Sequence, residues 1–302
     1  MVRFTKYQGA GNDYLFIDGR EQQEDWPALA KAMSDRHFGV GSDGIIVAAP
    51  SSEAPIRMRI FNADGSEGEM CGNGIRCFAK FALEGGMVDG GRDSLAIETG
   101  AGVLTVEPRW TSDRVTSALV DMGDPILRAV DVPVDASKIG PSDYAALDAG
   151  MVEELGLKTQ DLLFDAPIQV NGTTFVSTAV SMGNPHIVAF IDEPVDGIAL
   201  DKLGPLVEHH EAFPKRINFH VVNVVDRTRL VSRTWERGSG MTLACGTGAS
   251  AMVVVARLHG LVDDVVNVRL PGGELVITWR GHGPVTMEGD AVEVFSGEFP
   301  AV

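Results

Sequence analysis

The sequence predicts two similar α+β domains, each built from short strands around one central helix. Three observations support this fold class: an internal repeat, an apolar helix-length segment at the same place in each copy, and short strand-like runs bounded by turn residues. The length of 302 residues also exceeds the usual size of a single hydrophobic core, which favours two domains.

The repeat is clearest at two CGxG sequences. Cys71 begins CGNGIRCFAKFALEGGMVD, and Cys245 begins CGTGASAMVVVARLHGLVD. Upstream, Asn12 and Asn184 each follow a glycine and begin a run that ends FID. The two asparagines precede the two cysteines by 59 and 61 residues, respectively, so two distant landmarks recur at nearly the same offset. Such a match indicates a duplicated domain.

The elements follow from local patterns. Residues 75–83 and 249–258 contain no Pro or Gly and are mostly apolar, which predicts a buried helix after each CGxG. A third, short helix is expected within 145–155. The predicted strands are 15–17, 45–48, 58–61, 95–98, 103–106, 187–190, 219–225, 266–270 and 292–295.

The expected domain boundaries follow from the repeat. The first domain spans residues 1–126, and the C-terminal strand within 288–302 could return to complete it. The second domain spans 127–287. Its Asp-, Pro- and Ala-rich stretch near 137–163 is interpreted as an insertion.

Composition excludes several classes of function. The net charge is −17, whereas nucleic acid and anionic membranes need a basic partner surface. No apolar run approaches the length of a membrane span, and the N-terminus lacks a secretory signal pattern. The three cysteines lack zinc-ligand spacing and indicate a reducing compartment. We therefore expect a cytoplasmic protein with a small-molecule substrate, no metal and no cofactor.

The two CGxG sequences predict a proton-transfer site. A cysteine at a helix N-terminus is expected to have a lowered pKa, because the unpaired amides and the helix dipole stabilise its thiolate. The same amides can bind a carboxylate. If two such helix N-termini face one substrate, the thiolate of one cysteine could remove an α-proton while the thiol of the other returns a proton to the opposite face. The amides expected to hold the carboxylate are those of Gly72, Asn73, Gly246 and Thr247.

The repeat is asymmetric beside the cysteines. Asn62 stands nine residues before Cys71, whereas Glu236 stands nine before Cys245 and is followed by Arg237. Arg237 could bind a second carboxylate with two hydrogen bonds, and Glu236 could accept from an ammonium or shift a thiol pKa. His186 could bias the protonation of a cysteine. The third cysteine, Cys77, is replaced by alanine in the second copy and is expected to lie in the core.

The chain resembles the diaminopimelate epimerase family across nearly its whole length. The segments that carry this resemblance are KYQGAGNDYLFID, FNADGSEGEMCGNGIRC, TAVSMGNPH, FPKRINF and WERGSGMTLACGTGA. The resemblance implies two pseudo-symmetric domains, each a mostly antiparallel sheet wrapped around a central helix, with the active site in the interdomain cleft. It also implies interconversion of LL- and meso-2,6-diaminopimelate for lysine and peptidoglycan precursors, without pyridoxal phosphate or metal, in an enzyme that often forms homodimers.

The resemblance also assigns roles to individual residues. Cys71 and Cys245 match the acid/base pair, and His186 and Glu236 match positions that tune the cysteines. The residues implied to line the substrate pocket are Asn12, Asn62, Gly72, Asn73, Asn184, Asn218, Glu236, Arg237, Gly246 and Thr247. One departure is Met241, where the family commonly has an acidic residue in ERGxGET.

Three other functions are compatible with these residues. Because Met241 departs from the family pattern, the chain could instead be a related cysteine-dependent racemase that acts on another amino acid. A redox protein could cycle a disulfide between Cys71 and Cys245. A binding module would bind a ligand without exchanging its α-proton.

Overall fold

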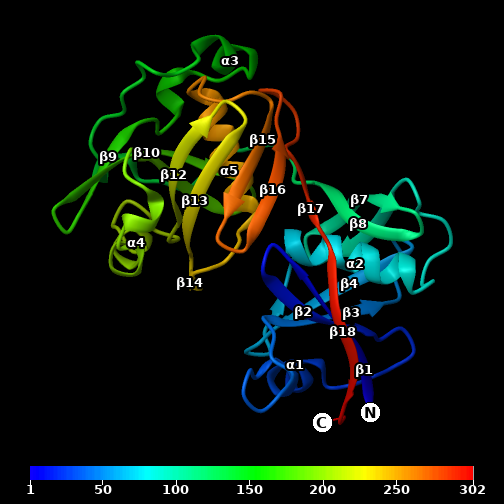
Figure 1. Ribbon diagram of the computed structural model, residues 1–302. Coiled ribbons are helices and arrows are strands. Elements are labelled where there is room, and N and C mark those ends of the chain that lie inside the picture. The colour runs from blue at the N-terminus through cyan, green and yellow to red at the C-terminus, as the bar shows by residue number, and fades with distance from the viewer. Residues whose placement is uncertain (302) are drawn as a thin grey trace. The chain divides into compact units, whose positions relative to one another are not determined.

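The computed structural model describes residues 1–301, which divide into two compact units (Figure 1). Unit 1 contains Met1–Asp121 together with the C-terminal segment from Glu288, and unit 2 contains Met122–Met287. The first structural boundary lies at the end of a strand, near the boundary expected at residue 126. No helix among residues 1–301 is long and apolar enough to cross a membrane.

Unit 1 is built mainly from antiparallel strands around one 13-residue helix. Its helices are α1 (Trp26–Ser34) and α2 (Gly72–Glu84). Its strands are β1 (Val2–Gly9), β2 (Asn12–Asp18), β3 (Gly44–Ala49), β4 (Ile56–Asn62), β5 (Glu67–Gly68), β6 (Leu95–Thr99), β7 (Gly102–Thr111), β8 (Arg114–Asp121) and β18 (Val292–Phe299). Strand β17 (Thr286–Asp290) crosses the second boundary between the units.

Unit 2 has the same kind of framework and several further short helices. Its helices are α3 (Ala149–Glu154), α4 (Leu200–Glu208), α5 (Gly246–Leu258) and three 3₁₀ turns at Ala136–Lys138, Thr159–Asp161 and Val195–Gly197. Its strands are β9 (Ala166–Val170), β10 (Thr173–Ser181), β11 (Pro185–Phe190), β12 (Asn218–Asp226), β13 (Arg229–Glu236), β14 (Gly240–Met241), β15 (Val265–Leu270) and β16 (Gly273–Thr278).

The strand pairings repeat from one unit to the other. In unit 1, β2 pairs parallel with β3, β3 antiparallel with β4, and β4 antiparallel with the short β5 and parallel with β6. In unit 2, β11, β12, β13, β14 and β15 pair in the same senses. The duplication seen in the sequence is therefore a duplication of topology, and the predicted α+β class with mostly antiparallel pairing is confirmed.

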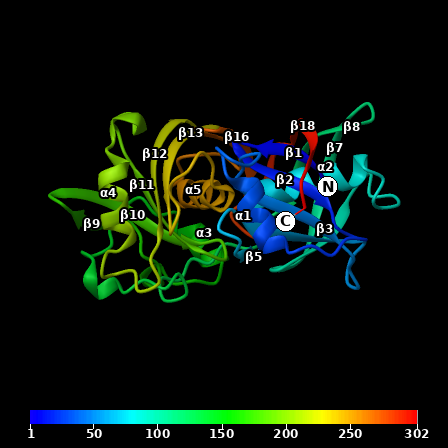
Figure 2. The ribbon, with the colours of Figure 1, turned by 90° about the horizontal axis from the view of Figure 1, so that it is seen from below.

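A long central helix lies against several strands in each unit. Helix α2 contacts β1, β2, β3, β7 and β8, and α5 contacts β10, β11, β12, β15 and β16. Figure 2 shows the coil of α5 among the strands of unit 2. Most residues of both helices are buried, because strands surround them on several sides. The two predicted central helices are confirmed, and each begins directly after its cysteine, at the CGxG sequence as expected.

Every predicted strand lies within an observed one, but two helices of moderate length were not predicted. Helix α4 was missed because Gly204 and Pro205 interrupt its sequence. Gly204 is required there: an added Cβ would lie 2.4 Å from the Trp235 ring. Helix α1 is only nine residues long, although Asp25 caps it and Pro27 stands in its first turn, both ordinary signals of a helix start. Strand β18 pairs antiparallel with β1.

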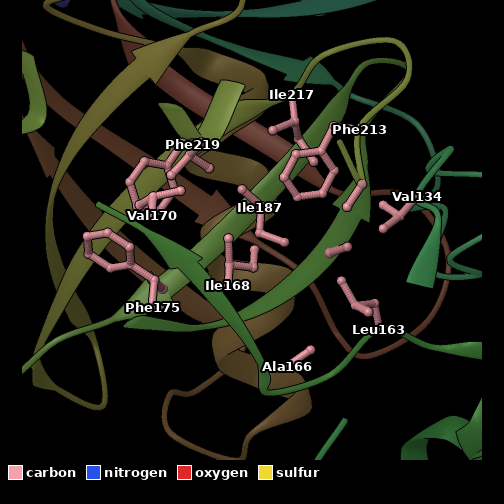
Figure 3. Close-up of a cluster of buried hydrophobic side chains, with 14 of the residues drawn as sticks. Val134, Leu163, Ala166, Ile168, Val170, Phe175, Ile187, Phe213, Ile217 and Phe219 are labelled. Carbon is pink, nitrogen blue, oxygen red and sulfur yellow. The ribbon is translucent and has the colours of Figure 1, made fainter. Parts of the chain in front are cut away.

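The sheet of unit 2 has a second apolar core on the face opposite α5. Its members include Phe175, Ile187 and Phe219 on neighbouring strands, together with Leu200 and Val207 of α4. Figure 3 shows several of these side chains converging from the strands. Side chains alternate between the two faces of a strand. The residues beside Ile187 and Phe219 therefore point to the other face, toward α5.

Candidate active site

Cys71 is the N-cap residue of α2, and its side chain already takes part in hydrogen bonds. The thiol donates to Oδ1 of Asn12 over 3.2 Å, and the N–H of Gly74 donates to Sγ over 3.3 Å. Asn12 is oriented from its other end, because its Nδ2 donates to Asp43 over 2.5 Å. The sequence predicted Asn12 and Cys71 as site residues, and the structure places them in direct contact. Asp43 was not predicted.

Cys245 is the N-cap residue of α5 in unit 2, and its neighbours differ from those of Cys71. Its Sγ lies 3.6 Å from Oγ1 of Thr247. Glu236 also interacts with the thiol through a hydrogen bond and through its charge. The carboxylate of Glu236 is held by Thr242, whose hydroxyl donates to it over 2.5 Å. The structure thus brings three predicted residues together and adds Thr242 as a support.

Burial raises the pKa of both thiols, which corrects the expectation that the helix N-terminus lowers it. For Cys71, burial outweighs the opposing hydrogen bonds from the Gly74 amide and the Tyr14 hydroxyl. For Cys245, burial and then the negative charge of Glu236 hold the pKa well above its usual value. The sequence showed the helix start but not the depth at which each thiol is buried. Both cysteines are therefore thiols at neutral pH, and Cys245 resists ionisation more strongly.

His186 is fully buried and does not carry a charge at neutral pH. Burial and the neighbouring His220 lower its pKa well below the usual value. Its Nε2 lies 2.8 Å from Oδ1 of Asn184, and Nδ2 of Asn184 lies 3.3 Å from Oγ1 of Thr247. The predicted residues Asn184, His186 and Thr247 therefore form one connected set next to Cys245, in which Asn184 and Thr247 lie between His186 and the thiol.

Glu236 ends β13 and Arg237 begins the loop that follows, and hydrogen bonds from other elements hold this loop in place. Asn218 accepts from the backbone N–H of Arg237 over 2.9 Å and donates to the carbonyl of Pro185 over 2.7 Å. Buried Glu208 accepts from the N–H of Gly238 over 2.9 Å. Asn218 was predicted to bind substrate, and the structure gives it this bracing role. Glu208 was missed because it lies on the unpredicted helix α4.

The remaining predicted residues of unit 1 lie near the start of α2 or on the strand that precedes it. Asn62 is exposed at the end of β4, and its Nδ2 donates to Ser66 over 3.0 Å. Asn73 is buried, and its Oδ1 accepts from Arg76 over 2.9 Å. The side chain of Asn73 therefore bonds within α2, and its backbone N–H is directed toward the Cys71 thiol. Gly72 and Gly246 are the first residues of α2 and α5.

Met241 lies on the opposite side of the β13–β14 hairpin from the thiol. It pairs with Trp235 across the hairpin, is half exposed, and its Sδ is 3.4 Å from Nη2 of Arg233. The corresponding pair in unit 1 is Arg59 and Glu67, which are joined by hydrogen bonds of 2.8 and 2.9 Å. Met241 thus replaces one partner of a peripheral ion pair.

The chain matches the family model described as diaminopimelate epimerase over residues 4–127 and 178–294. A diaminopimelate epimerase of Acetivibrio thermocellus is 42% identical over 299 residues, which cover 98% of each chain. The chain belongs to the diaminopimelate epimerase family. A second relative, the diaminopimelate epimerase of Desulfovibrio desulfuricans, is 44% identical over 300 residues, covering 99% of this chain and 98% of its own. The insertion expected at 137–163 stays a prediction; this stretch lies outside the residues that the family model matches.

Solved structures with much lower identity have the same fold. A Bacillus anthracis phenazine biosynthesis protein of the PhzF family matches with a TM-score of 0.67 and 18% identity, covering 99% of both chains. A probable proline racemase from Agrobacterium radiobacter matches with a TM-score of 0.64 and 13% identity, covering 99% of this chain and 93% of its own. At these identities the likeness concerns the fold alone.

Proposed function

We propose that this chain interconverts LL- and meso-2,6-diaminopimelate by removing and returning the α-proton with Cys71 and Cys245. Its membership in the diaminopimelate epimerase family supports the substrate. The observation that carries the chemistry is the matched placement of the two thiols, each the N-cap of the long helix of its unit. The proposal requires that both thiols reach opposite faces of one α-carbon when substrate is bound.

The two cysteines are proposed to differ in protonation state when substrate binds, with Cys71 as the thiolate and Cys245 as the thiol. A two-base reaction needs one thiolate and one thiol at the moment substrate binds. Because Glu236 adds to the effect of burial at Cys245, Cys71 gives up its proton more readily. In the direction that begins with a Cys71 thiolate, Cys71 takes the α-proton and Cys245 gives its own proton to the other face. The reaction leaves Cys71 protonated and Cys245 ionised, and proton exchange of both groups with solvent resets the enzyme.

The helix starts supply the stabilisation that this step requires. An α-proton is much less acidic than a thiol, so negative charge that develops on the substrate carboxylate must be stabilised. Amide N–H groups in the first turn of a helix have no partner within the helix, and they favour an anion. The amides of Gly72 and Asn73 and of Gly246 and Thr247 are the proposed donors to this carboxylate.

The distal end of the substrate is proposed to bind polar and charged side chains, most of them in unit 2. Asn62, Asn184, Asn218, Glu236 and Arg237 are the candidates. Arg237 is exposed and is tethered by a hydrogen bond of 3.2 Å to the carbonyl of Lys215, which leaves most of its donors available for a carboxylate. Asn218 and Glu208 hold the loop that presents Arg237, directly after Glu236 at the end of β13. The function fits a small-molecule enzyme of the cytoplasm, and a homodimer is part of the proposal.

Solvent exchange tests the substrate. Incubation with LL-diaminopimelate in D2O should replace the α-proton with deuterium and generate the meso isomer, which proton NMR and chiral chromatography would follow. Exchange with another amino acid but none with diaminopimelate would instead establish a related racemase. Binding of diaminopimelate without any exchange would indicate a binding module.

A further inference from the structure

A row of hydrogen-bonded polar side chains crosses three strands beneath the start of α5. Nδ1 of His186 on β11 lies 2.9 Å from Nε2 of His220 on β12, and Nδ1 of His220 lies 2.9 Å from Oγ1 of Thr234 on β13. At its other end, Nε2 of His186 lies 2.8 Å from Oδ1 of Asn184. Both histidines are fully buried and Thr234 is nearly so.

Strand register explains why these residues meet. The β12–β13 pairing places His220 directly opposite Thr234. The β11–β12 pairing places His186 two residues from the partner of His220, on the same face of the sheet. That face is turned toward α5, because a Cβ added at Gly248 would lie 2.5 Å from Cε1 of His220 and 3.1 Å from Sγ of Cys245. The row therefore lies immediately under the second thiol.

The donors and acceptors in the row can be assigned. Both histidines are neutral, since burial lowers the pKa of His220 to about 3 and that of His186 well below its usual value. A neutral imidazole has one donor and one acceptor nitrogen. Oδ1 of Asn184 only accepts, so His186 donates to it from Nε2 and accepts at Nδ1. His220 must then donate from Nε2 to His186 and accept at Nδ1 from the Thr234 hydroxyl.

The nitrogen of the Asn184 amide continues the row toward Cys245. Because its oxygen accepts from His186, its Nδ2 is directed to Oγ1 of Thr247, 3.3 Å away. Thr247 in turn lies 3.6 Å from Sγ of Cys245. We propose that His220 and Thr234 are positioning residues that set the tautomer of His186 and the orientation of Asn184, and thereby the hydrogen bonding of the Cys245 thiol. The inference rests on the proposed function of Cys245 as an acid/base group.

Unit 1 shows that the fold does not require this row. The same register positions on β3 and β4 are occupied by Ile46 and Ile60, which face each other across the strands as His220 and Thr234 do. Both isoleucines are buried. A buried polar group is costly unless its hydrogen bonds are made, and an apolar pair fills these positions without that cost. Retention of the polar pair beneath Cys245 alone therefore favours a role in the site.

The variant that tests the row is Thr234→Val, which keeps the shape of the side chain and removes its hydroxyl. By analogy with outer-shell partners of functional ligands, we expect kcat to fall roughly 10-fold, with little change in KM. Thr234→Ser should restore most of the lost activity. Ser232→Ala is the matched control: Ser232 is buried two residues earlier on the same face, and its hydroxyl has no hydrogen-bond partner among the described residues. A kcat of Thr234→Val equal to that of Ser232→Ala would overturn the proposal.

A second measurement needs neither a variant nor a substrate. Nitrogen-15 NMR of the imidazoles distinguishes the two neutral tautomers, and we expect both His186 and His220 to carry their proton on Nε2 in the wild-type protein. Finding His186 protonated on Nδ1 would overturn the proposal even if Thr234→Val were slow or unfolded. The tautomer result is also independent of the wild-type exchange assay with LL-diaminopimelate, so failure of the proposed function would be recognised separately.

Discussion

The thiols of the two units occupy the same place in the fold but have different neighbours. Cys71 donates to the Asn12 amide and receives the N–H of Gly74, and it has no carboxylate counterpart to Glu236, since Asn62 occupies that position. Cys245 has Glu236 beside it and a row of neutral polar groups beneath it. Duplication thus provided two equivalent thiols, and substitutions around them separated their acidities and gave unit 2 the charged residues expected to bind the distal end of the substrate.

The two thiols would not form an acid/base pair if either one were dispensable for turnover. Cys71→Ala and Cys245→Ala should each lower epimerase turnover by about 10³-fold, within the range of general acid–base contributions, because each removes the group that serves one face of the α-carbon. Turnover would be measured with purified protein and diaminopimelate of either configuration.

The matched control for this experiment is Cys77→Ala. Cys77 is buried within α2, burial raises its pKa to about 12, and the corresponding residue of α5 is Ala251. This variant should keep near-normal turnover. Near-normal turnover in Cys71→Ala or Cys245→Ala would contradict the two-base assignment.

Removal of the charge on Glu236 should reduce the difference in pKa between the Cys71 and Cys245 thiols. Glu236→Gln is expected to lower turnover roughly 10- to 100-fold, the usual effect of altering a supporting group. The same change should speed alkylation of Cys245, because the nearby negative charge that raises its pKa is gone. Mass spectrometry after brief iodoacetamide treatment would measure both cysteines.

In that experiment Cys71 serves as an internal reference, and Glu67→Gln, on the corresponding hairpin of unit 1, is the matched carboxylate control. Neither alkylation rate should change in Glu67→Gln. An unchanged rate at Cys245 in Glu236→Gln would show that the carboxylate does not influence the thiol.

The pH dependence of alkylation compares the thiols in the unmodified enzyme. A raised pKa leaves less thiolate at neutral pH, so both rates should increase as the pH rises above the usual thiol range. At each pH below the two transitions, Cys71 should react faster than Cys245, because its pKa is raised less. Cys77 should react more slowly than either. The reverse order for Cys71 and Cys245 would refute the assigned difference in acidity.

The smallest effect is expected from Met241→Glu. This change would recreate beside Arg233 the ion pair that Arg59 and Glu67 make in unit 1. Surface ion pairs contribute little, so the free energy of unfolding should change by less than about 1 kcal/mol. Activity should stay close to that of the wild type, as measured by turnover and chemical denaturation. A large change in activity would mean that this hairpin position controls the thiol or the substrate.

Much of the framework was predictable because the repeat is visible in the sequence itself. The apolar segments without Pro or Gly that follow Cys71 and Cys245 predicted both central helices. The His220–Thr234 contact was not predicted, since it depends on the register between β12 and β13, which pairs two residues that are 14 positions apart in the chain. The direction of the thiol pKa shifts was also predicted wrongly. Spacing identifies a helix start, but burial depends on how other strands cover it.

The isotope content of recovered substrate tests the two-thiol account most directly. LL-diaminopimelate would be converted in D2O to a small extent, and both isomers would be isolated and analysed by mass spectrometry. With separate bases for the two faces, the meso product should contain one solvent deuterium, whereas recovered LL substrate should retain its α-proton. Deuterium entering the recovered substrate as rapidly as the product would indicate a single base serving both faces and would contradict the account.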